Sequence, residues 1–196
     1  KQAIIKSSNN YFFKLFRKII NRKKDSNTYV DSRLGLIDWN NYVKNFGLGS
    51  SLNIDMPILS SGFVPSYNYY DDLYGRNRWK FSNIYSLSIG QGELLVTPLH
   101  LANLAAIIAN RGIYYTPKIV IEIDGKKVMN QKRINTDIDI NHYNYIIDAM
   151  EDVVKLGSAR RGYMNDIILC GKTSTVQNPH GYDHSGFFGF APKEKQ

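Results

Sequence analysis

The stretch ILCGKTSTVQNPHGYDHSGFFGF, residues 168–190, decides how this chain is interpreted. It predicts a short apolar strand, a tight turn at Asn-Pro-His-Gly, and a second strand, SGFFGFA. Lys172, Thr173, Ser174 and Thr175 interrupt the first strand with an ammonium group and three hydroxyls. Because side chains alternate along a strand, the two threonines should share one face and could bind one anion there, with Lys172 nearby. The alternative is an edge strand that these residues protect from pairing with another chain.

The composition is that of a globular protein and not of a membrane-spanning or disulfide-rich one. Apolar residues make up 43% and charged residues 21% of the 196 residues, which suits one domain or most of a larger one. No apolar stretch approaches the roughly 20 residues of a membrane helix. The single cysteine, Cys170, excludes an intrachain disulfide and is expected to be a buried thiol.

The net charge of +8 is concentrated in the run KLFRKIINRKK, residues 14–24. The preferred interpretation is the solvated side of an amphipathic helix. Binding to nucleic acid or to an anionic surface is the alternative, since charge alone is not specific.

Hydrophobic spacing and helix start and stop signals predict four helices, at residues 2–21, 39–46, 98–110 and 141–156. The third is the best specified, because Thr97 is a good N-cap and Pro98 suits the first helical position. Residues 47–92 show little periodicity and are expected to form a functional loop region. A hairpin is expected around Asp124-Gly125. Helices followed by an antiparallel strand pair predict an α+β domain.

Lys-Thr followed by a small residue is one of three motifs of the penicillin-recognising serine enzymes, beside Ser-x-x-Lys and a Ser-x-Asn element. Ser7-Ser8-Asn9 supplies a Ser-x-Asn element within the first predicted helix, near its beginning. Three further segments are similar to segments of these enzymes and occur in the same order: FGLGSSLNIDMPILSSGFVPS, RNRWKFSNIYSLSIGQGELLVTPLHLANLAAIIANRG and AMEDVVKLGSARRG. The chain therefore resembles the transpeptidase domain of class B penicillin-binding proteins, of the elongation type called penicillin-binding protein 2, over nearly its whole length.

The resemblance implies an α+β penicillin-binding/β-lactamase-like fold, with a five-stranded antiparallel sheet flanked by helices. Residues 1–196 would be a partial domain, truncated at both ends, from the Ser-x-Asn motif to just past the Lys-Thr-x strand. It also implies a peptidoglycan D,D-transpeptidase that cross-links D-Ala-D-Ala stem peptides in cell-wall synthesis and elongation through a serine acyl-enzyme. β-Lactam antibiotics and a membrane glycan polymerase would be partners. The protein would be located at the periplasmic face of the inner membrane. No cofactor and no nucleic acid are implied.

The resemblance also assigns roles to residues of this sequence. Ser7 would relay protons between two catalytic lysines, of which Lys172 is one, and Asn9 would bond the substrate amide. Thr173 and Thr175 would bind the substrate carboxylate, and the backbone N–H of Thr175 would be one oxyanion donor. Ser174 belongs to the same substrate-binding strand but stands where the family has glycine, so its side chain could narrow the site or be tolerated.

One feature limits these expectations. The chain contains no Ser-x-x-Lys tetrapeptide, so the nucleophile is expected upstream of Lys1, and this chain alone is expected to be inactive. A decayed, catalytically inactive piece of the same fold and a basic nucleic-acid-binding module remain alternatives.

His180, Asp183 and His184 lie close in sequence but lack a fourth ligand and a defined spacing, so a structural role and no metal is expected.

Overall fold

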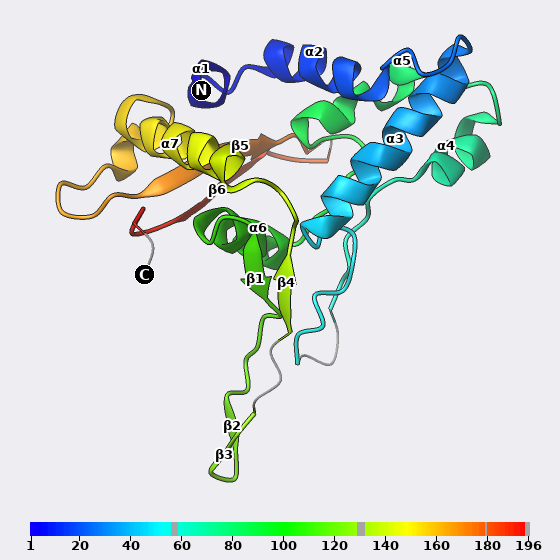
Figure 1. Ribbon diagram of the computed structural model, residues 1–196. Helices are drawn as coiled ribbons and strands as arrows, with labels where there is room; N and C mark the ends of the chain where they lie inside the picture. The colour runs from blue at the N-terminus through cyan, green and yellow to red at the C-terminus, as the bar shows by residue number, and fades with distance from the viewer. Residues whose placement is uncertain (56–58, 129–131, 179, 195–196) are drawn as a thin grey trace. The chain divides into compact units, whose positions relative to one another are not determined.

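A computed structural model describes residues 1–55, 59–128, 132–178 and 180–194. The chain forms two compact units. The first consists of Lys1–Ser7, Ser51–Ser60 and Thr97–Gln196, and the second of Ser8–Ser50 and Ser61–Val96. Each unit is described by itself (Figure 1).

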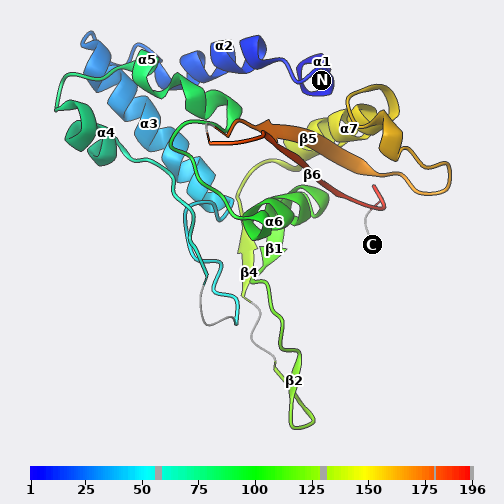
Figure 2. The ribbon, with the colours of Figure 1, turned by 180° about the vertical axis from the view of Figure 1, so that it is seen from behind.

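The first unit is built on a strand pair with two helices. β5 (Cys170–Val176) and β6 (His184–Phe190) pair antiparallel. α7 (Ile140–Leu156) packs against β5, and α6 (Pro98–Ala109) packs against β6 (Figures 1 and 2). The strand pair and both helices predicted from the sequence are confirmed.

Both helices begin and end as their sequences predict. The Thr97 hydroxyl accepts a hydrogen bond from the backbone N–H of His100 at 3.3 Å, which caps α6. The Asp139 carboxylate caps α7 by accepting from Asn141 N at 2.7 Å, and Gly157 ends that helix. The apolar side of α7 is buried through six residues: Tyr143, Ile147, Ala149, Met150, Val153 and Val154.

A short helix, α1 (Gln2–Ile5), packs against α7. The Lys1 ammonium pairs with Asp152 at 2.7 Å, and Ile5 is buried. The contact is close, because a Cβ added at Gly157 would lie 3.0 Å from the carbonyl oxygen of Ile5. The end of α1 is thereby held beside the helix that covers β5.

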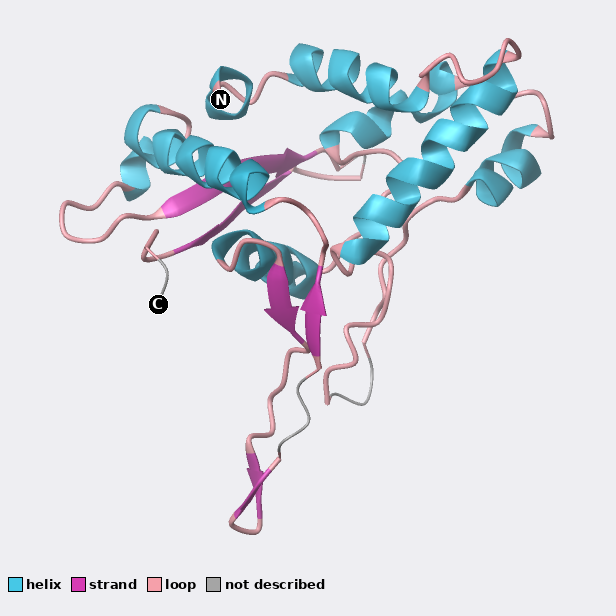
Figure 3. Cartoon of the chain, viewed as in Figure 1, coloured by secondary structure: helices cyan, strands magenta, loops and turns pink. Residues whose placement is uncertain are grey.

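Two small strand pairs complete the first unit (Figure 3). β1 (Ile113–Tyr115) pairs with β4 (Arg133–Asn135), which the sequence did not predict. β2 (Glu122–Ile123) and β3 (Lys126–Lys127) form the predicted hairpin. Its turn, 124–125, has two positive φ angles, +50° and +74°, as a type I′ turn requires. A single 3-10 turn, η2 (Arg160–Gly162), follows α7.

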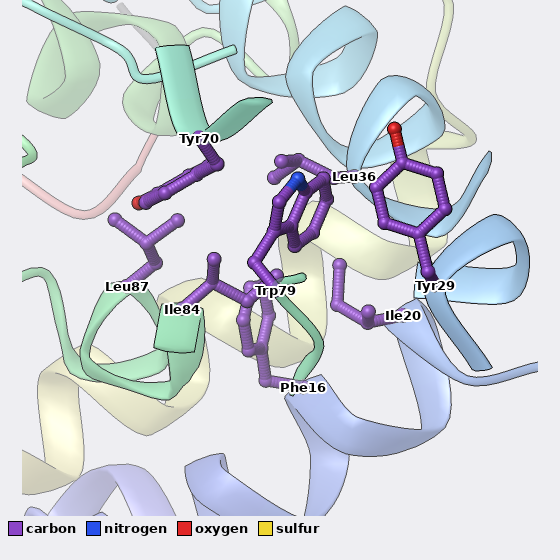
Figure 4. Close-up of a cluster of buried hydrophobic side chains, with 8 residues drawn as sticks. All are labelled: Phe16, Ile20, Tyr29, Leu36, Tyr70, Trp79, Ile84 and Leu87. Carbon is purple, nitrogen blue, oxygen red and sulfur yellow. The ribbon is translucent and has the colours of Figure 1, made fainter. Parts of the chain in front are cut away.

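The second unit is helical. It contains α2 (Asn9–Ile20), α3 (Thr28–Asn45), α4 (Tyr67–Tyr74), α5 (Phe81–Ile84) and the 3-10 helix η1 (Tyr85–Ile89). Its core gathers buried side chains from all five helices and from the segment between α4 and α5, which supplies Trp79: Phe16, Ile20, Tyr29, Leu36, Tyr70, Trp79, Ile84 and Leu87 (Figure 4).

Trp79 is central to this core. Its ring centroid lies 5.4 Å from that of Tyr29 and 5.5 Å from that of Tyr70. Its indole Nε1–H and the Tyr29 hydroxyl both donate to the Asp71 carboxylate, at 2.7 and 2.8 Å. The polar groups of these two buried aromatic side chains are therefore both hydrogen-bonded to one carboxylate, as buried polar groups require.

Three predictions from the sequence are corrected. The helix expected over 2–21 is two helices, separated where Ser7 takes a φ of +47° and the Ser8 hydroxyl caps α2 by accepting from Tyr11 N at 3.4 Å. The helix expected over 39–46 is the end of the longer α3. The expected loop region, 47–92, contains α4, α5 and η1, because local capping and the shared core specify them without a clear apolar period.

The sheet also differs from the one that the resemblance implies. The described residues form three separate two-stranded sheets and not one of five strands. β5 and β6 are the pair that carries the Lys-Thr-x motif. No helix in the described part of the chain combines the length and the apolar character needed to cross a membrane.

Candidate active site

β5 runs from the interior of the first unit to its surface. Cys170 and Gly171 are buried, the next three residues are half-buried, and Thr175 is exposed. Burial raises the pKa of the Cys170 thiol to about 11, so the thiol stays protonated and unreactive at neutral pH. Lys172 therefore stands where the strand loses its apolar cover, as the sequence predicted.

The Lys172 ammonium makes two hydrogen bonds. Its Nζ donates to the Ser7 hydroxyl, across 165 positions of sequence, and to the backbone carbonyl of Thr173 at 2.8 Å. Burial lowers the pKa of Lys172, because a partly desolvated ammonium loses hydration. At a given pH more of this lysine is a free amine than of an exposed lysine.

Ser7 is held in an unusual conformation. It follows Lys6, the C-cap residue of α1; its N–H donates to Ile4 O at 3.2 Å, and its φ is +47°. The left-handed region costs a non-glycine residue on the order of 1–2 kcal/mol. The packing of α1 on α7, and of α7 on β5, maintains this conformation and places the hydroxyl beside Lys172.

Thr173 and Thr175 lie on the opposite face of β5 from Lys172, since side chains alternate along a strand. The register sets Thr173 opposite Phe187 and Thr175 opposite Ser185. The Thr173 hydroxyl is also hydrogen-bonded to the Ser158 hydroxyl, at 2.6 Å. One face of β5 therefore carries two hydroxyls, and the Thr173 hydroxyl is bonded to a neighbouring serine.

Ser174 lies on the same face as Lys172. Its strand partner is Gly186, and a Cβ added there would lie 2.5 Å from the Ser174 Oγ. The Ser174 side chain thus occupies the space that a side chain at residue 186 would need. This placement does not favour contact between its hydroxyl and a ligand held by Thr173 and Thr175.

The arrangement combines two chemical capacities. A lysine with a lowered pKa, hydrogen-bonded to a serine hydroxyl, can pass a proton along that bond. Hydroxyls on an exposed strand face can donate to a carboxylate.

The family model described as "Penicillin binding protein transpeptidase domain" matches residues 1–196. The chain belongs to this transpeptidase family.

Individual relatives support the same conclusion. This chain is 27% identical to the Peptidoglycan D,D-transpeptidase MrdA of Acinetobacter baumannii, over 99% of this chain and 30% of that protein. The crystal structure of Pseudomonas aeruginosa PBP2 in complex with WCK 5153 is similar with a TM-score of 0.77 and 27% identity, over 97% of this chain and 40% of that one. The fold also matches, at 20% identity and a TM-score of 0.78, a peptidoglycan synthase complex that coordinates polymerization and crosslinking. The chain spans about 30% of the MrdA relative's length.

The predicted contact is confirmed: the Ser7 hydroxyl and the Lys172 ammonium are hydrogen-bonded. The shared face of Thr173 and Thr175 follows from the observed strand. Asn9 is the first residue of α2, in the second unit. The catalytic and binding roles of these residues stay predictions.

Ser158 was missed by sequence reasoning. It lies in the segment AMEDVVKLGSARRG, which matches the family, but no spacing rule indicates that its hydroxyl meets the Thr173 hydroxyl. Only the fold of the loop between α7 and β5 brings the two together.

The polar residues between β5 and β6 hold the connection. The Asp183 carboxylate accepts from Asn178 N at 3.2 Å, and Asn178 Oδ1 accepts from His180 N at 3.0 Å. Pro179, part of the predicted turn, lies outside the described residues. In the described ranges, no three His, Cys, Asp or Glu side chains gather as a metal site would require.

Proposed function

We propose that this chain is part of a peptidoglycan D,D-transpeptidase, which cross-links D-Ala-D-Ala stem peptides through a serine acyl-enzyme. One observation carries the proposal: the Lys172 ammonium, on a strand with Thr173 and Thr175, donates to the hydroxyl of the distant Ser7. Membership of the transpeptidase family and similarity to MrdA support the substrate class.

In this mechanism a serine hydroxyl attacks the carbonyl carbon between the two D-alanines. The new C–O bond forms, the C–N bond breaks, and D-Ala leaves with a proton on its nitrogen. An amine of a neighbouring stem peptide then attacks the ester, forms the cross-link and releases the serine. A β-lactam would acylate the same serine through its strained amide.

Lys172 and Ser7 serve proton movement in both steps. The hydrogen bond between them allows a proton to pass toward the leaving nitrogen and back, and the lowered pKa of Lys172 makes its ammonium a readier proton donor than that of an exposed lysine. Its charge also attracts the substrate carboxylate.

Thr173 and Thr175 would hold that carboxylate, and Ser158 would orient the Thr173 hydroxyl. Thr175 N–H would stabilise the developing oxyanion. Asn9 would bond the substrate amide. For Ser174 we propose a position in the substrate strand without a side-chain contact to the substrate, because its Oγ lies over residue 186 of β6.

The wider assignment also belongs to the proposal. A membrane glycan polymerase would be the partner. The protein would be located at the periplasmic face of the inner membrane. The family supports both, and so does the fold shared with a synthase complex that couples polymerization to crosslinking.

A fluorescent penicillin tests the proposal on the full product of the gene that encodes this chain. We expect covalent labelling that survives denaturation and is blocked by excess unlabelled β-lactam. The chain of residues 1–196 alone should not label, because it has no Ser-x-x-Lys tetrapeptide. A folded full product that stays unlabelled would refute the proposal in favour of an inactive member of the fold.

A further inference from the structure

The second unit has a groove that the transpeptidase site does not use. It lies at the C-terminal half of α2, the loop into α3 and the start of α5, and its volume is about 1120 Å³. Six cationic side chains line it: Lys14, Arg17, Lys18, Lys23, Lys24 and Lys80. We call this feature the basic groove.

The helical part of the groove follows from residue spacing. Lys14, Arg17, Lys18 and Asn21 are three, four and seven positions apart, and such residues lie on one face of a helix. The other side of α2 buries Phe16 and Ile20 in the core. The cations therefore project together from a helix whose orientation in the unit is set by packing.

The loop part of the groove is held by a buried carboxylate. Asp31 is only 5% exposed, and it accepts hydrogen bonds from the backbone N–H groups of Lys23 and Lys24, at 3.2 and 2.9 Å. Lys23 has a φ of +60°, a left-handed conformation that a lysine adopts only when its surroundings impose it. The loop thus presents both ammonium groups from a defined backbone.

The positive charge is mostly uncompensated. Lys24 pairs with Asp38 at 3.0 Å, and the Arg17 guanidinium lies 5.9 Å from the centre of the Phe81 ring. Within the described part of the chain, the remaining four lysines of the basic groove make no ion pair. Two carboxylates line the groove, and one of them is the buried Asp31. Like charges are gathered here at a cost to the free protein, which an anionic ligand would relieve.

The size and lining of the groove distinguish between anions. Small-ligand pockets measure about 300–1,000 Å³, so a groove of about 1120 Å³ suits an extended chain better than one small ion. Sites for single-stranded nucleic acid stack bases on aromatic rings. Phe81, the one aromatic residue among the described lining residues, lies beneath Arg17. Ser26 and Thr28 instead offer hydroxyls that suit sugar hydroxyls, whereas the Asn21 amide N–H groups already donate to Asp31 and Ser32.

We propose that the basic groove binds an acidic polysaccharide chain, with the lysines on its charged groups and the hydroxyl residues on its sugars. The proposal is independent of the proposed transpeptidase function, because penicillin labelling needs neither the groove nor its ligand.

Fluorescence anisotropy with a labelled oligogalacturonate tests the groove on the full gene product. We expect saturable binding that weakens as salt rises. Lys14→Gln/Lys18→Gln should weaken binding at least about fivefold, since two exposed ionic contacts are lost. Lys14→Arg/Lys18→Arg should retain it. Lys126→Gln/Lys127→Gln removes the same charge from β3, outside the groove, and should leave binding within about twofold.

Three results would overturn the proposal. They are no saturable binding of the oligogalacturonate, an equal loss in the two Lys→Gln variants, and tighter binding of a single-stranded oligonucleotide of equal charge. The last result would identify the groove as a nucleic-acid site. Penicillin labelling of Lys14→Gln/Lys18→Gln should equal that of the unaltered protein, which shows that the variant is folded.

Discussion

The substitution Lys172→Met distinguishes a catalytic role of Lys172 from a structural role. Methionine keeps an unbranched apolar stem of nearly the same length but removes the ammonium and both of its hydrogen bonds, to the Ser7 hydroxyl and to Thr173 O. Two bonds from a charged donor stabilise a fold by roughly 1.5–3 kcal/mol each. Burial opposes this gain, because it lowers the pKa of Lys172 and so disfavours the ammonium in the folded state. The opposing terms should leave the free energy of unfolding within about 2 kcal/mol of the unaltered protein.

The acylation rate should respond far more strongly. Loss of a positioned proton-transfer group costs about 10²–10⁴ in rate. The assay is stopped-flow acylation of the full gene product by a fluorescent penicillin, paired with urea denaturation followed by far-UV circular dichroism. Because the folded pKa of Lys172 is lowered, the rate of the unaltered protein should rise with pH below 10.5, the usual lysine pKa, and this rise should vanish in Lys172→Met.

Lys193→Met is the matched control. The Lys193 ammonium bonds Asp148 and Glu151, both at 2.6 Å, and no residue of the candidate site. Its loss leaves two carboxylates facing each other, so stability should fall while acylation per folded molecule stays within about twofold. The reasoning on Lys172 fails if Lys172→Met acylates within fivefold of the unaltered protein, or if its loss of rate equals its loss of folded protein.

Three further predictions concern packing and charge. Gly35→Ala should destabilise the second unit by about 2 kcal/mol or more, because a Cβ there would lie 2.5 Å from a backbone Cα of α2; Leu34→Ala should cost less than half of that. Urea denaturation followed by tryptophan fluorescence checks this, since both tryptophans belong to that unit, and equal costs would contradict it. Gly186→Ala should destabilise the β5–β6 pair, and adding Ser174→Gly should restore about 1 kcal/mol in a double-mutant cycle, because the new Cβ would lie 2.5 Å from the Ser174 Oγ; additive costs would show that the two positions are independent. Lys155 and Lys193 lower the pKa of the Glu151 carboxyl below its usual 4.5. The protein should therefore be more stable than Glu151→Gln above pH 4.5, and this difference in stability should disappear as the pH falls through the lower folded pKa. Thermal melts at several pH values measure the difference, and a difference that does not change with pH would exclude the ion pairs as its source.

Local signals predicted the parts of the fold whose stability is local. α6 has an N-cap at Thr97 and proline at its first position, and α7 combines an apolar stripe with a stop at Gly157. The hairpin at residues 124–125 has the residues that its positive φ angles need. In each case one short segment contains its own start, period and stop, so tertiary contacts only reinforce it.

The second unit was predicted poorly because its helices depend on distant contacts. α3 contains Gly35, which weakens a helix by local propensity but permits the close approach of Ile20 at the end of α2. α4 begins at a serine cap, and its Tyr70 is buried against Trp79. A residue that lowers local propensity and improves packing is misjudged whenever packing is unknown.

The candidate site shows the same division between local and tertiary information. Alternation along β5 placed Thr173 and Thr175 on one face, which needs only the strand. The contact of Lys172 with Ser7 came from family resemblance and not from any pattern, since it joins residues 165 positions apart. The bond from Ser158 to Thr173 was missed because neither pattern nor motif marks it.

The error at the head of the chain is the most informative one. Apolar spacing continues across residues 2–21 and predicts one helix, yet the chain breaks at Ser7, takes a left-handed φ there and starts α2 at the Ser8 cap. A continuous helix would carry the Ser7 hydroxyl in a helical geometry, whereas the break allows it to meet Lys172. Backbone strain of this kind persists where surrounding contacts impose it, and it is concentrated at functional sites. The local rule therefore fails at the residue whose hydroxyl meets the Lys172 ammonium, because contacts distant in sequence decide the backbone there.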